Sequence, residues 1–177
     1  MGEAPKQLSQ LLERIFDRHY ELIYRTAYSV TGSAADAEDI VQTIFVRLLN
    51  RELPPDLSTA PERYLYRAAF NLSLNTIRDK KREVLTGNME AFDTTYDPRD
   101  ASAEDLVLDQ ALREAIAMLH PAAAQIVILR YVHDYGLADI ARMLGTTRST
   151  VAVSLYRSRS YLKKYLSGTR KGGNYAV

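Results

Sequence analysis

The fold of the C-terminal half is decided by the stretch LADIARMLGTTRSTVAVSLYRSRSYLKKYL, residues 137–166. Its first eight residues carry apolar side chains at a helical spacing, and Gly145 permits the chain to turn. Thr147 can then cap a second helix, whose expected buried positions are Val151, Leu155, Leu162 and Leu166. Two short helices joined by a glycine form the helix-turn-helix pattern, in which the second helix offers its first residues to the DNA major groove. The same arrangement also occurs in proteins that do not bind DNA.

Charge is distributed unevenly along the 177-residue chain, although its formal net charge is only +1. Residues 86–110 hold one basic and seven acidic residues, net −6, whereas residues 111–177 hold ten basic and three acidic residues, net +7. After Asp139 the chain has eight basic residues and no acidic one. A folded segment of one sign favours a polyanion such as DNA or a membrane surface. A solvated helix face would give the same pattern.

The second helix of this pattern is expected to contact DNA phosphates with its later residues and base edges with its first residues. Basic side chains late in the helix suit phosphates, which add affinity without sequence choice. Arg148, Ser149 and Thr150 at the front are the expected base readers. The residues expected to share the outward face are Arg148, Ala152, Tyr156, Arg159 and Lys163, with Arg157 and Lys164 beside them.

Composition excludes several function classes. The chain has no cysteine, and His19, His120 and His133 are scattered without the spacing of metal ligands. A covalent or metal-dependent enzyme is therefore not expected, and no cofactor is implied. No apolar run approaches the roughly 20 residues of a membrane span, and the N-terminus has no secretion signal, so the expected location is the cytoplasm.

Three helices are expected in the N-terminal half. The first ends at Gly32, and Ser33 caps the second, whose acidic residues crowd the first turns where the helix dipole favours them. A Pro-rich break follows, and Thr59 with Glu62 forms a predicted capping box that opens a long third helix.

The middle of the chain is expected to be a linker. Residues 85–101 lose helical periodicity and gather Gly, Asn, Asp and Pro, which is typical of a flexible acidic segment. It separates a predicted domain of residues 1–84 from one of residues 102–177, where Ser102 restarts a helix that runs to Leu119. Since no useful β-alternation occurs, the predicted fold is all-α, with two small helical domains.

The long third helix is apolar on nearly all sides. Leu65, Ala68, Ala69 and Leu72 form a core stripe, while Tyr64, Tyr66 and Phe70 lie on other faces among basic residues. Aromatic rings beside cations suit unpaired bases, because stacking tolerates any base and cations hold the backbone. Taken singly, the rings are better explained as the core of a helical bundle.

Three stretches together resemble bacterial RNA polymerase sigma factors of the extracytoplasmic-function (ECF) group of the sigma-70 family. DAEDIVQTIFVRLL, residues 36–49, is similar to a region 2 motif of the form D-A-E-D-hydrophobic-V-Q-x-x-F. YLYRAAFNLSLNTIRDKKR, residues 64–82, resembles the W-L-Y-R-I-A-x-N segment and its basic run, and residues 119–162 resemble region 4. The three motifs in this order span nearly the whole chain and are far more specific than any one alone.

The resemblance implies roles for the matched residues. Asp36, Asp39 and Gln42 fall where the family docks on the polymerase β′ clamp helices, although Asp36 also suits a plain helix-dipole acid. Asn71 matches the asparagine that contacts the flipped base of the minus-10 element. Residues 54–63 would form the loop that holds this base, and Tyr64 stands at the position where the family usually has Trp. The other implied minus-10 contacts are Arg63, Arg67, Asn75, Arg78, Lys80, Lys81 and Arg82. The implied minus-35 contacts are Arg148, Ser149, Thr150, Tyr156, Arg157, Arg159 and Lys163.

The implied function is transcription initiation without catalysis. The protein binds core RNA polymerase, bridges the minus-35 and minus-10 elements and promotes melting at minus-10. Its implied partners are core polymerase, through the β′ clamp helices and the β flap, promoter DNA, and an anti-sigma factor; no membrane insertion is expected.

One departure from the family leaves two alternatives open. Ala152 and Ser154 stand where many relatives carry cations, and each lost phosphate contact flattens the salt dependence of DNA binding by about one unit of slope. The chain could therefore be a sigma mimic that only occupies an anti-sigma factor. A dimeric helix-turn-helix regulator is the other alternative, although it leaves the region 2 motifs unexplained.

Overall fold

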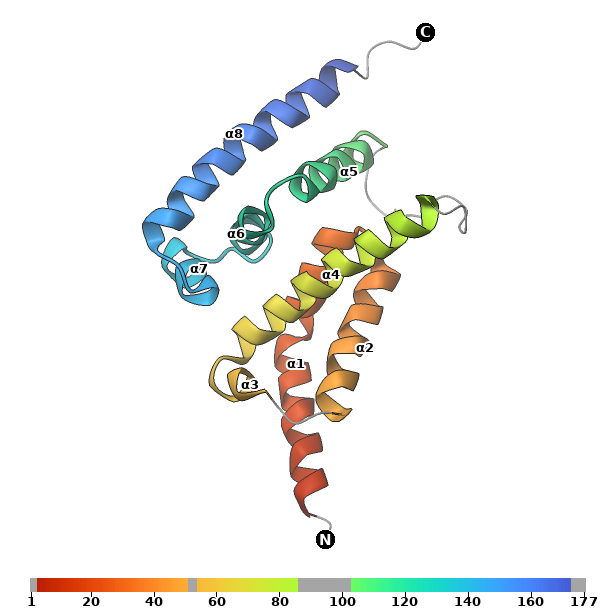
Figure 1. The fold of residues 1–177 in the computed structure, drawn as a ribbon, viewed down its shortest axis with the longest axis vertical. Coiled ribbons are helices and arrows are strands. Elements are labelled where there is room, and N and C mark those ends of the chain that lie inside the picture. Colours follow the sequence, from red (N-terminus) through yellow and green to blue (C-terminus); the bar gives the residue numbers. More distant parts are fainter. Residues whose placement is uncertain (1–2, 51–53, 86–102, 173–177) are drawn as a thin grey trace. The chain divides into compact units, whose positions relative to one another are not determined.

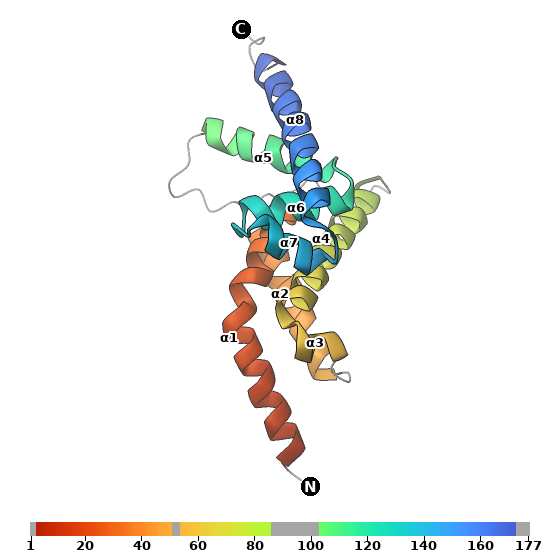
Figure 2. The same ribbon diagram turned by 90° about the vertical axis from the view of Figure 1, so that its left-hand side faces the viewer.

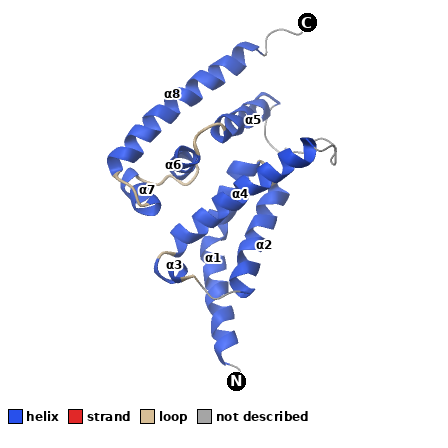
Figure 3. Cartoon of the chain, in the orientation of Figure 1, coloured by secondary structure: helices blue, strands red, loops and turns tan. Residues whose placement is uncertain are grey.

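The computed structural model describes residues 3–50, 54–85 and 103–172, and each regular element within these ranges is an α-helix (Figure 3). The chain divides into two compact units, Met1–Tyr96 and Asp97–Val177. The predicted all-α fold is confirmed. The predicted linker, residues 85–101, lies outside the described residues except for Leu85. The helices are α1 (Glu3–Thr31), α2 (Ala34–Asn50), α3 (Pro55–Thr59), α4 (Pro61–Leu85), α5 (Ala103–Ala117), α6 (Pro121–Tyr131), α7 (Leu137–Leu144) and α8 (Arg148–Gly172).

The first unit is a bundle in which α1, α2 and α4 pack on one another and the short α3 packs on α4 (Figures 1 and 2). Each long helix contributes its apolar stripe to one core, and burying each large aliphatic side chain is worth roughly 1.5–3 kcal/mol. A polar contact fixes α1 against α2, since the Tyr20 hydroxyl donates to a Glu38 carboxylate oxygen at 2.7 Å. This hydrogen bond, with burial adding to it, raises the pKa of Tyr20 to about 12. The buried core members include Ile23, Ala27, Ala37, Val41, Leu65 and Ala69.

The boundary between α1 and α2 forms as the sequence predicts. Gly32 has φ 70°, a left-handed conformation that glycine adopts without steric cost. The Ser33 side chain accepts a hydrogen bond from the backbone N–H of Asp36 at 3.2 Å, which satisfies one free donor at the start of α2. The predicted stop and cap are therefore confirmed.

The start of α4 differs from the prediction. The segment after Pro54 forms a helix of its own, α3, and Thr59 is its last residue, with its hydroxyl donating to the Pro55 carbonyl at 3.4 Å. Ala60 precedes α4, and its carbonyl accepts from the backbone N–H of Tyr64 at 3.1 Å. The predicted capping box of Thr59 and Glu62 is therefore wrong. Burial of the Leu57 side chain, which is 2% exposed, explains why this segment forms a short helix instead of an irregular loop.

The second unit is built around α8, which packs against α5, α6 and α7. Four consecutive residues of α6, Ile126 to Leu129, are buried, so α6 is covered on most of its circumference. Helix α5 ends at Ala117, two residues before the predicted end at Leu119, and the proposed restart at Ser102 lies outside the described residues.

The helix-turn-helix forms at the predicted residues. Gly145 ends α7 with φ 65° and ψ 39°, in the left-handed region, and its backbone N–H donates to the carbonyl of Ala141. The Thr147 side chain then accepts from the backbone N–H of Thr150 at 3.1 Å, so Thr147 caps α8 as predicted. The geometry of the turn and the cap together fix how α7 leads into α8 (Figure 1).

Candidate nucleic-acid and polymerase interfaces

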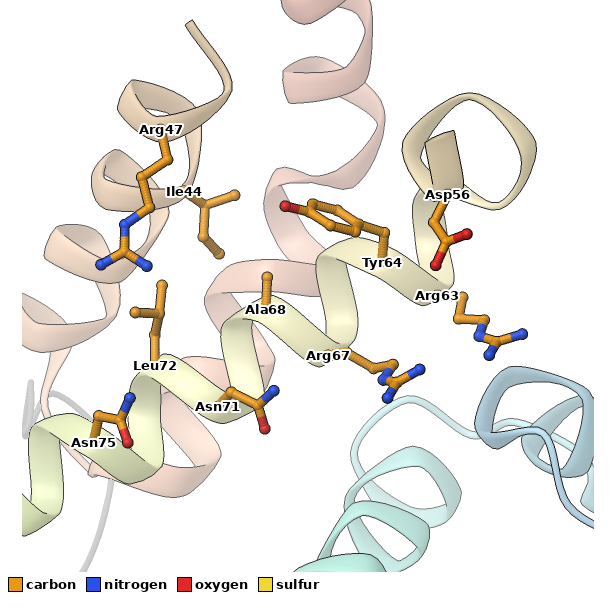
Figure 4. Close-up of a pocket in the computed structure, with 10 residues that line it drawn as sticks. All are labelled: Ile44, Arg47, Asp56, Arg63, Tyr64, Arg67, Ala68, Asn71, Leu72 and Asn75. Atoms are coloured by element: carbon orange, nitrogen blue, oxygen red, sulfur yellow. The ribbon is translucent and has the colours of Figure 1, made fainter. Parts of the chain in front are cut away.

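A pocket of about 460 Å³ runs along the exposed side of α4 in the first unit (Figure 4). Its wall on α4 contains five predicted minus-10 residues, namely Arg63, Tyr64, Arg67, Asn71 and Asn75. Asn71 and Asn75 are exposed, so their amides can both donate and accept hydrogen bonds at the pocket surface. The other lining residues are Ile44 and Arg47 of α2, Asp56 of α3, and Ala68 and Leu72 of α4.

Two pocket residues were not expected from the sequence. Arg47 extends from the last turn of α2 toward α4, and Asp56 lies on α3 at the far end of the pocket (Figure 4). Arg47 makes the pocket more basic, since three guanidinium groups and one carboxylate line it. Because Arg47 and Asn71 are far apart in sequence, only the packing of α2 on α4 brings them to the same pocket.

Burial separates the aromatic residues of α4. Tyr66 and Phe70 are 0% and 1% exposed, and their ring centroids stack 6.4 Å apart. Tyr64 is only partly buried, and its ring faces Ile44 across the pocket (Figure 4). The aromatic surface that the pocket presents is therefore Tyr64, at the position where the family resemblance expects an aromatic residue.

Several basic residues near the end of α4 have acidic neighbours. Lys80 Nζ donates to a carboxylate oxygen of Asp36 at 2.5 Å, with the two side chains 29% and 14% exposed. Arg82 lies 3.4 Å from Asp79 on an exposed surface, where such a pair contributes little. Arg78 is exposed, and the side chain of Lys81 lies outside the described residues. The Lys80–Asp36 pair links a residue assigned to DNA with one assigned to polymerase.

The outer face of α2 carries the other two residues assigned to polymerase. Asp39 and Gln42 are exposed and lie one turn apart, so they share a face, whereas Asp36, one turn before Asp39, is half-buried and paired with Lys80. Two exposed apolar side chains continue the same face, Val46 at 53% and Leu49 at 55% exposure. The sequence analysis missed both residues, although helical spacing places them away from the buried stripe that contains Ile44 and Leu48.

The centre of the exposed surface of α8 differs from the outward face that the sequence predicts. The buried residues are Val151, Leu155, Ser158 and Leu162, which lie on one face. Positions two residues earlier point in the opposite direction, because two residues turn an α-helix by about 200°. We call this row the outward ridge, and it consists of Ser149, Val153, Tyr156 and Ser160. The predicted outward residues Arg148, Ala152, Arg159 and Lys163 are all exposed, but on one flank of the ridge.

Two local contacts organise the ends of this surface. At the front of α8, the Thr147 hydroxyl lies 2.9 Å from that of Ser149 and 2.8 Å from that of Thr150, so the three hydroxyl groups share hydrogen bonds. Further along, the Arg159 guanidinium lies 5.8 Å from the ring centroid of Tyr131, a cation–π distance. The front of the helix is therefore uncharged apart from Arg148, and at least one later cation is positioned by a neighbouring ring.

Within the described residues, no cluster of three or more His, Asp or Glu side chains could hold a metal ion. In the same part of the chain, no helix has both the length and the apolar character to cross a membrane.

Comparisons with known proteins agree with this architecture. The model of Sigma-70 region 2 matches residues 15–83, and the model of Sigma-70 region 4 matches residues 109–162. The chain is 28% identical over 163 residues to the ECF RNA polymerase sigma factor SigW of Bacillus subtilis, covering 86% of this chain and 87% of that protein. It is 26% identical to the RNA polymerase sigma factor YlaC of the same organism, covering 90% and 94%.

A solved structure shares the fold. It is the sigma factor RpoE in complex with the anti-sigma factor NepR from Bartonella quintana, with a TM-score of 0.54, 20% identity, and coverage of 92% of this chain and 98% of that one. Together the two family models match more than half of the chain. The chain belongs to the sigma-70 family, in the ECF group, and is an alternative sigma factor for transcription initiation.

Proposed function

We propose that this protein binds core RNA polymerase through α2, captures an unstacked base of the minus-10 element in the α4 pocket, and places α8 in the major groove of the minus-35 element. The proposal rests on the pocket, because it gathers an aromatic ring, two exposed amides and three guanidinium groups on one side of the helical bundle. No covalent chemistry is required of these residues.

Promoter melting follows from binding alone in this scheme. Extruding a base from a duplex costs a few kcal/mol, which a pocket repays by stacking on the base and hydrogen bonding to its edge. Tyr64 provides the stacking surface, and Asn71 provides a donor and an acceptor that can pair with a base edge. The guanidinium groups of Arg63 and Arg67 hold the strand through its phosphates.

Replacing Asn71 with Ala tests this role. We expect open-complex formation to fall by about 5- to 150-fold, since removing a base-specific hydrogen-bonding pair costs about 1–3 kcal/mol. Affinity for core polymerase should remain unchanged, because the amide is exposed on α4 and is not part of the outer face of α2. Gln10→Ala, at an exposed position of α1, is the matched control. Permanganate reactivity of minus-10 thymines measures melting, and an equal loss of polymerase affinity would show that Asn71 is structural.

The polymerase contact is assigned to the outer face of α2. Asp39 and Gln42 supply charge and hydrogen bonds, and the adjoining Val46 and Leu49 supply apolar area that water now covers. A polar pair beside exposed apolar side chains has the composition of a protein interface. An anti-sigma factor is the other protein partner we propose, because the structural relative RpoE was solved with one.

A sigma mimic remains the second candidate because of Ala152 and Ser154. Ala152 is exposed and uncharged where many relatives carry a cation, and Ser154 is half-buried. Run-off transcription with core polymerase and a promoter library discriminates between the two candidates. Defined start sites support initiation, whereas absence of product together with tight binding to an anti-sigma domain would support the mimic.

A further inference from the structure

The outward ridge of α8 is uncharged, and cations lie on both of its sides. Ser149, Val153, Tyr156 and Ser160 form the ridge on the side away from the buried face, and Arg157 and Lys164 border it closely. One flank carries Arg148, Arg159 and Lys163, and the other carries Arg157 and Lys164. A helix in the major groove directs its central ridge toward base edges and its flanks toward the two phosphate backbones. The charge on α8 therefore suits docking, while the ridge holds the side chains that face the bases.

Val153 is the apolar member near the front of this ridge. Its side chain is 49% exposed, and it borders a groove that Met118, Leu119 and His120 also line, so part of its apolar surface stays open to a ligand. A valine has no donor or acceptor, so it cannot recognise the polar atoms of a base edge. In the major groove, the apolar group that distinguishes one base from the others is the 5-methyl group of thymine.

We propose that Val153 determines part of the minus-35 specificity by contacting the 5-methyl group of a thymine in the major groove. The inference rests on the proposed function, since it assumes that α8 enters the groove of promoter DNA. Ser149, one turn earlier on the ridge, faces the neighbouring base pair with a hydroxyl group that accepts or donates. Recognition is thereby shifted from cations toward methyl contacts, which explains how a helix with little charge at its front can select a sequence.

Removal of single methyl groups from DNA tests the proposal directly. The full-length protein with core polymerase first selects promoters from a library randomised at minus-35. In the selected promoter, each minus-35 thymine is then replaced by deoxyuridine, which removes the methyl group and retains every hydrogen-bonding atom. At one or two positions, we expect holoenzyme affinity to fall about fourfold, as for the loss of one buried methyl group.

Val153→Ser and Val153→Thr show whether this residue detects the methyl group. For Val153→Ser, thymine and deoxyuridine promoters should bind equally, whereas Val153→Thr keeps one methyl group and should retain part of the difference. Both changes are at an exposed position, and unaltered circular dichroism checks the fold. No deoxyuridine effect at any position, or an equal effect in Val153→Ser, would overturn the proposal.

Two further results have distinct meanings. A weaker affinity of Val153→Ser for core polymerase, with unchanged promoter preference, would assign Val153 to a protein contact and would overturn the inference. Failure of the wild-type holoenzyme to select any promoter would instead refute the proposed function, and the methyl contact with it. The first result leaves transcription initiation intact, so the two failures are distinguishable.

Discussion

Asp36 and Asp39 lie on the same helix, but the structure predicts that removing their charges has different effects on the stability of the first unit. Asp36 is 14% exposed and forms an ion pair at 2.5 Å with Lys80, which is 29% exposed. Asp39 is exposed on the outer face of α2. Asp36→Asn should therefore destabilise the first unit, whereas Asp39→Asn should leave its stability within about 0.5 kcal/mol of the wild type.

The size of the effect follows from the burial of the pair. Exposed ion pairs contribute about 0.2–1 kcal/mol, and breaking a fully buried pair costs about 3–5 kcal/mol. The Asp36–Lys80 pair lies between these limits, so we expect a coupling energy of about 1–2 kcal/mol from the cycle of Asp36→Asn, Lys80→Met and the double variant. Loss of the favourable charge in the first turn of α2 adds about 0.3–1 kcal/mol to Asp36→Asn alone.

Hydrogen exchange of α2 amides measures this change in the full-length protein. A loss of one to two kcal/mol corresponds to exchange about 5 to 30 times faster. Binding of each variant to core polymerase is measured in parallel, and Asp39→Asn should weaken it without accelerating exchange. Zero coupling between Asp36 and Lys80, or a polymerase defect in Asp36→Asn as large as that in Asp39→Asn, would refute the structural assignment of Asp36.

Two other predictions concern pH and the turn between α7 and α8. Burial lowers the pKa of His19 from 6.5, Arg18 adds to this and Glu62 opposes it. Below pH 6.5, His19 binds a proton more readily in the unfolded chain than in the folded one. The contribution of neutral His19 to the free energy of unfolding is therefore complete above pH 6.5, and it decreases below that pH by up to about 1.4 kcal/mol per pH unit. Urea unfolding between pH 5 and 7.5 should show a smaller slope for His19→Gln, and an identical slope would contradict the prediction. Gly145→Ala should destabilise the second unit by about 1–2 kcal/mol, because alanine is strained in the left-handed region, and Gly145→Asn should cost less; thermal melts that show equal losses would exclude strain as the cause.

Most helix boundaries could be predicted from short stretches of sequence. Gly32 and Gly145 end their helices in left-handed conformations, and Ser33 and Thr147 cap the helices that follow. These features depend on sterics and hydrogen bonds within about four residues, so distant parts of the chain have little influence on them. Thr59 is the exception, because burial of Leu57 stabilises a separate short helix that local capping preferences do not anticipate.

The pairing of distant residues depended on tertiary packing. Asp36 and Lys80 are 44 positions apart, and Arg47 reaches the same pocket as Asn71 only because α2 packs on α4. The sequence identified Tyr64, Tyr66 and Phe70 as aromatic residues of one helix, and the structure showed that Tyr64 is the one lining the pocket.

The sequence by itself determined the helices other than α3, the turn that joins α7 to α8, and the family motifs, because periodicity, glycine sterics and capping are local properties. Helical periodicity also predicted the buried face of α8, but tertiary structure alone decided which distant residues share a pocket or an ion pair. On α8, burial of Val151 and Leu155 made Val153 part of the outward ridge. Helical spacing defines which residues share a face, but the approach of neighbouring helices determines which of those faces water, or DNA, can reach.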